Sequence, residues 1–235
     1  MTISGGRWQQ AQKAELQYWR GSGTRTYRIL NELVEHYSVV AEQIERFLPP
    51  KNGLDAVEIG VWGLGIGFLA VHTHRHFQRI IGVEPLPTEN ISVDDPAPED
   101  YARTLQSRVQ VVRSVGETLP FEGESFDVAC CINVLDHTRS PTAILREIGR
   151  VTRRGGIFIL GVHTKSLLDR AGWRVLRALH ARNPLYIAHP HIYSWNHLSA
   201  AVRAYGFSTL WANRPSMLRR LACRTVMSFW LLQKP

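Results

Sequence analysis

The stretch VEIGVWGLGIGFLA, residues 57–70, passes from an apolar run with a single acid into a tract that is rich in glycine. An apolar run followed by glycines is typical of a buried strand that turns sharply into a helix. In an open parallel sheet, a ligand lies beyond the carboxyl ends of the strands, and glycines let the first turn approach it closely. The stretch therefore predicts a ligand-binding turn in an α/β fold. Its glycines are Gly60, Gly63, Gly65 and Gly67.

The order of residues in this tract argues against two common phosphate-binding loops. A nucleoside-triphosphate loop ends in Gly-Lys-Ser or Gly-Lys-Thr, whereas this tract continues into Phe68 and Leu69. A dinucleotide fingerprint reads Gly-x-Gly-x-x-Gly, and the glycines here have a different spacing. The acid inside the strand, Glu58, indicates another kind of ligand. A carboxylate near the turn is able to receive a cationic amine, which a pyrophosphate lacks.

Short apolar runs alternate with helical patterns along most of the chain. Strands that are apolar on both faces and alternate with helices predict a parallel sheet that helices cover on both sides. The strand-like runs lie at residues 55–60, 79–83, 109–113, 126–132 and 156–162, and the helical segments at 7–19, 24–47, 65–76, 99–106 and 141–151.

The last third of the chain has a different pattern. Two β-rich runs, at residues 207–211 and 225–232, predict an antiparallel hairpin on the edge of the sheet. Before them, residues 165–182 form a basic amphipathic segment. This segment has three interpretations: an ordinary surface helix, a lid whose guanidinium groups bind substrate phosphates, or a helix that rests on anionic lipid.

Charge is distributed unevenly between the two halves. The net charge is +8, but residues 1–138 contain 12 Lys and Arg against 18 Asp and Glu, whereas residues 139–235 contain 16 against two. A strongly basic half attracts nucleic acid, anionic lipid headgroups or a phosphorylated small substrate. The charge therefore indicates the kind of partner rather than the fold.

Length and hydropathy limit the class of protein. A chain of 235 residues fits one domain with an ample core. No apolar stretch approaches the length that crosses a bilayer, so we expect no transmembrane segment. The polar, helical start lacks the basic and then apolar run of a signal peptide. We therefore expect a cytoplasmic protein, with membrane contact limited to the periphery.

Five segments, taken in order, resemble the class I S-adenosylmethionine-dependent methyltransferases. VEIGVWGLG resembles the first motif of that family, and IIGVEP places Glu84 where the family has an acid at the end of the second strand. RSVGETLPF is similar to the loop around the adenine, and ESFDVACCINVLDH to the fourth strand and its exit. AILREIGRVTRRGGIFILGV is similar to the following helix, Gly-Gly turn and fifth strand. The resemblance extends over residues 55–207 or so.

This resemblance implies an α/β, Rossmann-like, doubly wound fold. The sheet would have seven strands, mostly parallel, with an antiparallel C-terminal hairpin and N-terminal helices. We expect residues 1–50 to be an N-terminal helical lid and residues 51–235 to be the methyltransferase domain, with a basic helical insert at about 164–195.

The implied cofactor is S-adenosyl-L-methionine. The glycine tract and Glu58 would hold its amino-acid part, Glu84 its ribose hydroxyls, and the loop at 115–117 its adenine. Two departures from the family pattern are Trp62, an extra residue before Gly63, and Val115, where many relatives have Asp. The expected cofactor residues are Glu58, Gly60, Gly63, Gly65, Glu84, Pro85, Val115, Gly116, Glu117 and Asn133.

Histidine is the natural candidate for the catalytic base. A neutral imidazole suits deprotonation of a hydroxyl because its pKa lies near physiological pH. His137, within NVLDH, is our first candidate, and His191, within HPHIYSW, is the second. Asp136 either orients His137 or caps the following helix. The three histidines at 72, 74 and 76 are explained by a solvated helix end.

NVLDH also resembles the Glu-x-x-Glu-His pattern of ubiquinone-pathway O-methyltransferases. In that family the acids and the histidine bind a divalent cation. Here Asn133 and Asp136 replace the two glutamates, and the lost charge weakens Mg²⁺ binding at Asn133, Asp136 and His137. We therefore do not expect a metal.

The sequence thus predicts an S-adenosylmethionine-dependent O-methyltransferase that acts on a small substrate, either anionic or linked to a lipid or sugar. An RNA-directed methyltransferase would use the basic half, but the chain lacks the Asn-Pro-Pro-Tyr and Pro-Cys motifs of enzymes that modify bases. A nicotinamide-dependent oxidoreductase shares the sheet and the ribose acid but not the glycine spacing. A non-catalytic module that binds the cofactor is the third alternative.

Overall fold

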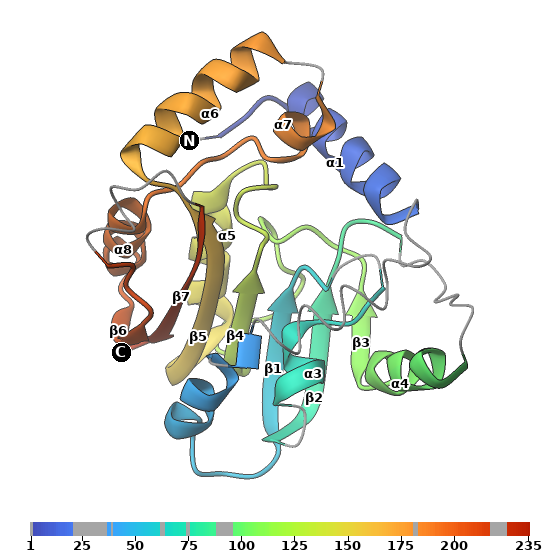
Figure 1. Cartoon of the computed structure of the whole chain (residues 1–235). Helices are drawn as coiled ribbons and strands as arrows, with labels where there is room; N and C mark the ends of the chain where they lie inside the picture. The colour runs from blue at the N-terminus through green and yellow to red at the C-terminus, as the bar shows by residue number, and fades with distance from the viewer. Residues whose placement is uncertain are drawn as a thin grey trace.

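The computed structural model describes residues 2–20, 37–38, 40–61, 64–73, 76–87, 96–180, 183–216 and 225–235. Seven strands in this part of the chain form one sheet (Figure 1). They are β1 (Leu54–Ile59), β2 (Phe77–Val83), β3 (Val109–Val112), β4 (Phe126–Ile132), β5 (Thr152–Thr164), β6 (Ser208–Ala212) and β7 (Val226–Gln233).

The strand order is β3-β2-β1-β4-β5-β7-β6. The first five strands are parallel to their neighbours, and β7 pairs antiparallel with both β5 and β6. The predicted mostly parallel, seven-stranded sheet with an antiparallel C-terminal pair is therefore confirmed. The chain order reverses at β1, where β2 lies on one side and β4 on the other, and a ligand crevice is expected at such a point.

The described helices flank the sheet or lie above it. Residues 40–47 are also helical, whereas residues 24–36 and 39 of the predicted second helix lie outside the described part. The predicted helix at 65–76 begins only at Phe68, because residues 64–67 form the turn itself. The labelled helices are α1 (Gly5–Arg20), α3 (Phe68–His72), α4 (Pro96–Gln106), α5 (Pro141–Val151), α6 (Leu167–Leu179), α7 (Pro184–Ala188) and α8 (Trp195–Ala204).

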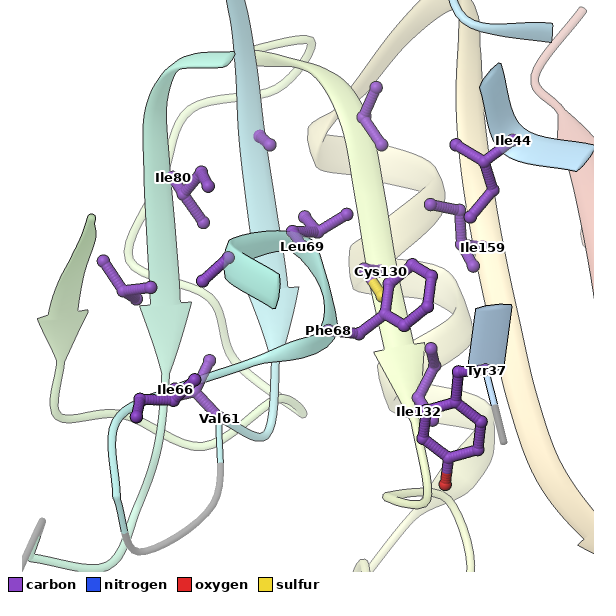
Figure 2. Packing of buried hydrophobic residues seen from close by; sticks show 14 of the residues in the cluster. Tyr37, Ile44, Val61, Ile66, Phe68, Leu69, Ile80, Cys130, Ile132 and Ile159 are labelled. Carbon is purple, nitrogen blue, oxygen red and sulfur yellow. The ribbon is translucent and has the colours of Figure 1, made fainter. Parts of the chain in front are cut away.

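Two apolar clusters, one on each face, hold the sheet between its helices. Alternate residues of a strand point to opposite faces, so Cys130 of β4 packs in one cluster and Cys131 in the other. Figure 2 shows the first cluster, in which Phe68 of α3 lies beside Cys130 and Tyr37. The second cluster packs α5 and α8 against the other face. Burial on both faces explains why these strands read as continuous apolar runs.

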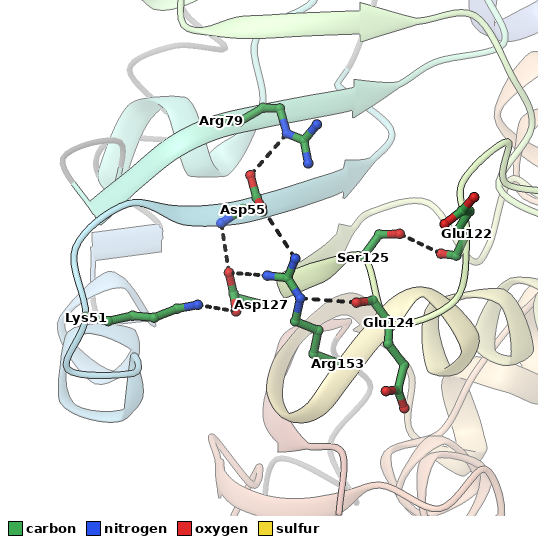
Figure 3. A network of polar contacts seen from close by, with 8 residues as sticks. All are labelled: Lys51, Asp55, Arg79, Glu122, Glu124, Ser125, Asp127 and Arg153. Carbon is green, nitrogen blue, oxygen red and sulfur yellow. Dashed lines mark hydrogen bonds and ion pairs between the residues drawn. The ribbon is translucent and has the colours of Figure 1, made fainter.

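A polar network fastens the amino ends of the central strands (Figure 3). Asp127, at the start of β4, accepts hydrogen bonds from Lys51 Nζ and Arg153 Nη1, each at 2.7 Å. Its other contact is the backbone N–H of Asp55, at 3.0 Å. Burial acts to raise the pKa of Asp127, but these three donors outweigh burial and hold the pKa below its usual value. The carboxyl ends of the strands lie at the opposite end of the sheet from this network.

Three helices cover the carboxyl ends of the central strands. α1, from the N-terminus, and α6 and α7, which follow β5, lie together above the carboxyl ends of the central strands (Figure 1). An edge-to-face contact between Trp173 of α6 and Tyr186 of α7, with ring centroids 4.7 Å apart, joins two of them. No helix among the described residues has the length and apolar character needed to cross a membrane.

Candidate active site

The glycine turn after β1 brings backbone close to the space above the sheet. Gly60 has a φ of +78°, and a Cβ atom at this position would overlap the side chain of Val134. Its N–H donates to the carbonyl of Val83 at the end of β2, at 2.8 Å. Gly65 also has a positive φ, of 66°, and Gly63 lies outside the described residues. The turn therefore needs glycine at position 60 for both conformation and space.

Glu58 has a different place from the one that we expected. Its carboxylate is buried and accepts hydrogen bonds from the N–H groups of Phe68, at 2.7 Å, and Leu69, at 3.0 Å. Burial raises its pKa to about 7, although these two amides and Cys130 act to lower it. Glu58 thus anchors the first turn of α3 from beneath, and neither it nor Gly65 lines the pocket described next.

A pocket lies at the carboxyl ends of β1, β2 and β4, where the chain order reverses. Its walls come from the turn after β1, the end of β2, the loop after β3 and the turn after β4. Seven of the expected cofactor residues line it: Gly60, Glu84, Pro85, Val115, Gly116, Glu117 and Asn133.

Glu84 is the acid of this pocket. It follows β2 directly, is buried, and accepts a hydrogen bond from the N–H of Leu86 at 3.0 Å. Burial raises its pKa to about 7; the Leu86 amide opposes that shift, the negative charge of Glu15 adds to it, and the Val61 amide and His137 act to lower it. A carboxylate in this position is able to accept hydrogen bonds from two neighbouring hydroxyl groups.

The loop after β3 forms the opposite wall. A Cβ atom on Gly116 would lie 2.7 Å from Ile59 Cγ2, so the loop approaches β1 only because this residue is glycine. Glu117 Oε1 accepts the N–H groups of Arg139, at 2.8 Å, and Ser140, at 3.1 Å. Glu117 therefore ties the loop to the start of α5 while it lines the pocket.

Asn133 follows β4 directly and has a φ of 56°, an unusual conformation that asparagine tolerates. Its Nδ2 donates to Tyr37 Oη at 3.2 Å, and its Oδ1 accepts from His163 Nδ1 at 3.0 Å. These two partners hold the side chain at the rim of the pocket.

Helix α1 closes the pocket from above. Trp8, Gln12 and Glu15, which are spaced to share one face of the helix, line it together with the sheet residues. The space left among all these side chains is about 80 Å³. Pockets that hold a whole cofactor have volumes of roughly 300 Å³ or more. Gln12 Oε1 is buried there without a hydrogen-bond partner in the described part of the chain.

His137 is the imidazole that lines the pocket. Glu15 Oε2 lies 3.3 Å from its Nδ1, and Asp136 Oδ2 lies 3.8 Å from its Nε2. Burial acts to lower the pKa of His137, but Asp136, Glu15 and the backbone of Ala188 together raise it to about 9. His137 is therefore a cation at neutral pH in this arrangement, and it joins α1 to the turn after β4.

Of the other two catalytic candidates, Asp136 supports His137 and His191 lies elsewhere. The negative charge of Asp136 is stabilised by His137 and His189, which hold its pKa well below the usual range against the effect of burial. His191 Nε2 donates to the carbonyl of Thr138 at 2.8 Å, and it does not line the pocket. His191 thus fastens its own segment to the turn that carries Asp136 and His137.

Two residues of this cluster were missing from the predicted site. His189 Nδ1 donates to Asp136 Oδ2 at 2.8 Å, and its ring packs against that of His137 with centroids 4.2 Å apart and the two planes tilted by 52°. The repeated histidine in HPHIYSW was a signal, but we selected His191 instead of His189. Glu15 had no local signal, because it contacts His137 only through the fold.

Asn133, Asp136 and His137 are the residues that would hold a metal if one were bound, although the sequence predicts none. Asn133 is engaged by Tyr37 and His163, whereas Asp136, His137 and His189 have one potential ligand atom each within 4.8 Å of one another. The Asp136 carboxylate accepts a hydrogen bond from His189. The cationic His137 beside it balances its negative charge. A single carboxylate with two imidazoles is also a poor match for Mg²⁺, which prefers oxygen ligands.

A family model with the description "Methyltransferase domain" matches residues 61–160. The matched segment runs from the glycine turn into β5 and includes Glu84, Asn133 and His137. The matched segment is therefore a methyltransferase domain. The cofactor of this family is S-adenosylmethionine, and the pocket has features that suit it: a buried acid at the end of β2, a glycine where a Cβ atom has no room, and the unpartnered Gln12 Oε1.

Curated relatives match the methyltransferase domain over part of their length. An uncharacterized methyltransferase from Mycobacterium sp. is 35% identical over 98 residues, which are 42% of this chain and 35% of the relative. A ubiquinone biosynthesis O-methyltransferase from Azorhizobium caulinodans is 30% identical over 135 residues, which are 57% of this chain and 49% of the relative. The chain thus spans about half or less of these relatives.

The same fold occurs in solved structures. A SAM-dependent methyltransferase from Thermotoga maritima superposes with a TM-score of 0.54 at 24% identity, covering 89% of this chain and 98% of that one. The YcgJ protein from Bacillus subtilis superposes with a TM-score of 0.59 at 18% identity, covering 85% and 97%. These likenesses extend the methyltransferase fold to the strands beyond the matched segment.

Proposed function

We propose that the chain transfers a methyl group from S-adenosylmethionine to an oxygen atom of a small acceptor, either anionic or linked to a lipid or sugar. The observation that carries this proposal is the position of Glu84. A buried acid stands at the end of β2, facing glycine backbone across the point where the strand order reverses. Such an acid suits the ribose of a nucleoside cofactor.

In this proposal different pocket residues contact different parts of the cofactor. Glu84 accepts hydrogen bonds from the ribose hydroxyls, and Gly60 lets the backbone approach the amino-acid part. Val115, Gly116 and Pro85 bound the adenine, and Asn133 lies near the reacting end. When bound, S-adenosylmethionine supplies the activated methyl group. Glu58 contributes through the turn that it anchors and not through direct contact.

We assign His137 the role of proton acceptor, because it is the imidazole that lines the pocket. Its pKa of about 9 means that it accepts a proton only after it has lost its own. The assignment therefore requires turnover to rise with pH until about 9. Asp136 acts through His137 and His189 as a positioning residue, and His191 secures the turn that carries them.

We propose that residues 1–50 act as a lid over the cofactor pocket. The gap of about 80 Å³ left by Trp8, Gln12 and Glu15 is too small for a cofactor, so α1 has to move outward before binding. In its outward position, α1 covers the bound cofactor and excludes water from the reacting atoms. The segment at about 164–195, which contains α6 and α7, forms the other part of the cover.

Helix α6 supports contact with an anionic membrane surface, because its apolar side faces outward. Leu168, Val175, Leu176 and Leu179 have exposed fractions of 62%, 58%, 44% and 71%, although they cluster around one side of the helix. Arg177, on the opposite side, is half-buried and donates to the carbonyl of Pro190 at 3.2 Å. A helix with exposed leucines and arginines around them is suited to the lipid–water interface.

Sedimentation with vesicles tests this contact. Wild-type protein should bind phosphatidylcholine vesicles that contain phosphatidylglycerol, and Leu179→Ser should reduce binding. Tyr101→Ser is the matched control, since Tyr101 is an exposed apolar residue on α4, on another part of the surface. Equal binding by both variants would contradict a role for α6.

The proposed activity itself is tested by transfer of a labelled methyl group. The full chain is incubated with labelled S-adenosylmethionine and a panel of sugar nucleotides, lipid extracts, phenols and RNA. We expect transfer into one of the first three classes, as a product with the stability of an O-methyl ether or ester. Transfer into RNA alone would favour the RNA-directed alternative, and cofactor binding without any transfer would favour a non-catalytic module.

A further inference from the structure

A second cavity lies on the other side of α1 from the cofactor pocket. It has a volume of about 490 Å³ and lies between α1, α6 and α7, the three helices at the top of Figure 1. Ser4, Arg7 and Gln10 line it from α1 and the residues just before it; Arg177 lines it from α6, and Tyr186 and Ile187 from α7. None of the residues that we assigned to cofactor or catalysis contributes to it.

The charge in this cavity is uncompensated. Among the residues that the structure describes, Arg7 and Arg177 line it and no acidic side chain does. Within the described residues, no carboxylate makes an ion pair with Arg7, Arg174 or Arg177. Like charges brought together without an acid repel one another, so this arrangement is unfavourable until an anion enters.

The surroundings of Arg177 agree with this interpretation. Burial lowers the pKa of the Arg177 guanidinium, and the charges of Arg7 and Arg174 lower it further. Its Nη1 donates to the carbonyl of Pro190, which fixes the direction of the guanidinium group. A guanidinium held in place at the wall of a cavity can offer its remaining N–H groups to one ligand.

The other lining groups add neutral donors. Ser4 and Tyr186 contribute hydroxyl groups and Gln10 an amide, while Ile187 forms an apolar wall. Two guanidinium groups with several neutral donors match a phosphate group, which carries up to two charges on several oxygens. A single carboxylate would leave much of this donor set unused.

We propose that this cavity binds a phosphate group, held between Arg7 of α1 and Arg177 of α6. Phosphate binding at this cavity does not depend on the proposed function. Because Arg7 and Trp8 are neighbours on α1, a phosphate here also holds the helix that closes the cofactor pocket.

Binding is measured on the full chain without cofactor, so that the result is separate from methyl transfer. The probes are inorganic phosphate, glycerol 3-phosphate, and phosphatidylcholine vesicles with and without phosphatidylglycerol. If the ligand is a soluble phosphate ester, calorimetry should detect binding of glycerol 3-phosphate. If the ligand is a lipid headgroup, sedimentation should detect binding only to vesicles that contain phosphatidylglycerol. Arg7→Gln and Arg177→Gln should each weaken the observed binding by about tenfold or more.

Arg203→Gln is the matched control, because Arg203 is an exposed arginine at the end of α8. It should leave binding within about twofold of wild type. Arg177→Gln also removes the contact with Pro190, so Arg7→Gln, which leaves that contact intact, decides the result if the Arg177 variant unfolds. Wild-type protein that binds none of the probes, or an Arg7 variant that binds them unchanged, would overturn the proposal. If the same preparation still binds S-adenosylhomocysteine, the failure concerns the phosphate site alone and not the proposed function.

Discussion

Glu15 Oε2 of α1 lies 3.3 Å from His137 Nδ1, which follows β4, so the N-terminal helix reaches directly into the pocket of the methyltransferase domain. The pair joins two segments that are far apart in the sequence. It also makes the charge of the proposed base depend on the position of α1, because Glu15 is one of the groups that raise the pKa of His137 to about 9.

Glu15→Gln should lower the pKa of His137, because the variant removes one of the two negative charges beside the imidazole while Asp136 remains. A pH titration of the His137 ring by NMR measures the shift directly. Glu42→Gln, at an exposed position outside the pocket, is the control. An unchanged His137 titration in the Glu15 variant would show that the two side chains do not interact in solution.

Glu84→Gln should weaken binding of S-adenosylhomocysteine by about 10- to 100-fold, since a hydrogen bond to a charged acceptor contributes roughly 1.5–3 kcal/mol. Calorimetry with the wild type and the variant provides the comparison. Glu122→Gln, at an exposed glutamate that does not line the pocket, should bind as the wild type does. Equal affinities for Glu84→Gln and the wild type would remove Glu84 from the ribose site.

The strands and the position of Glu84 were predictable because both depend on local sequence. A central parallel strand is apolar on both faces, and an acid that follows such a run stands at its carboxyl end. The contacts of Glu58 and Glu15 were not predictable in this way. Each depends on which segment folds back over the side chain, and the amides of Phe68 and Leu69 or the ring of His137 are placed by the fold. The contact of His189 with Asp136 depends on the fold in the same way.

Glu58→Gln should lower the free energy of unfolding by about 1–3 kcal/mol, because one of the two amide hydrogen bonds at the start of α3 loses its acceptor. The variant should also change the pH dependence. Since burial raises the pKa of Glu58 from 4.5 to about 7, the folded wild type holds this proton more tightly than the unfolded chain does.

The free energy of unfolding of the wild type should therefore fall as the pH rises from 4.5 to about 7, because the contribution of that proton is lost. The free energy of unfolding of the variant should not show this fall. Urea denaturation at several pH values measures both effects, with Asp100→Asn as a control at an exposed surface position. A variant with wild-type stability and the same pH profile would contradict the role of Glu58 as the anchor of the turn.

Trp8→Ala should speed association of the cofactor, because it enlarges the gap of about 80 Å³ beneath α1 and weakens the closed position of the helix. Stopped-flow measurement of S-adenosylhomocysteine binding gives the rate constant. Gln9→Ala, an exposed position on the same helix, controls for changes in helix stability. An association rate that Trp8→Ala leaves unchanged would mean that α1 does not limit entry.

A crystal structure of the full chain with S-adenosylhomocysteine shows where the cofactor binds. We expect that both ribose hydroxyls contact the carboxylate of Glu84, that the adenine lies against the loop of Val115 and Gly116, and that α1 has moved outward. Density for the ligand at any other place, or a bound nucleoside whose ribose leaves Glu84 without contact, would contradict this expectation.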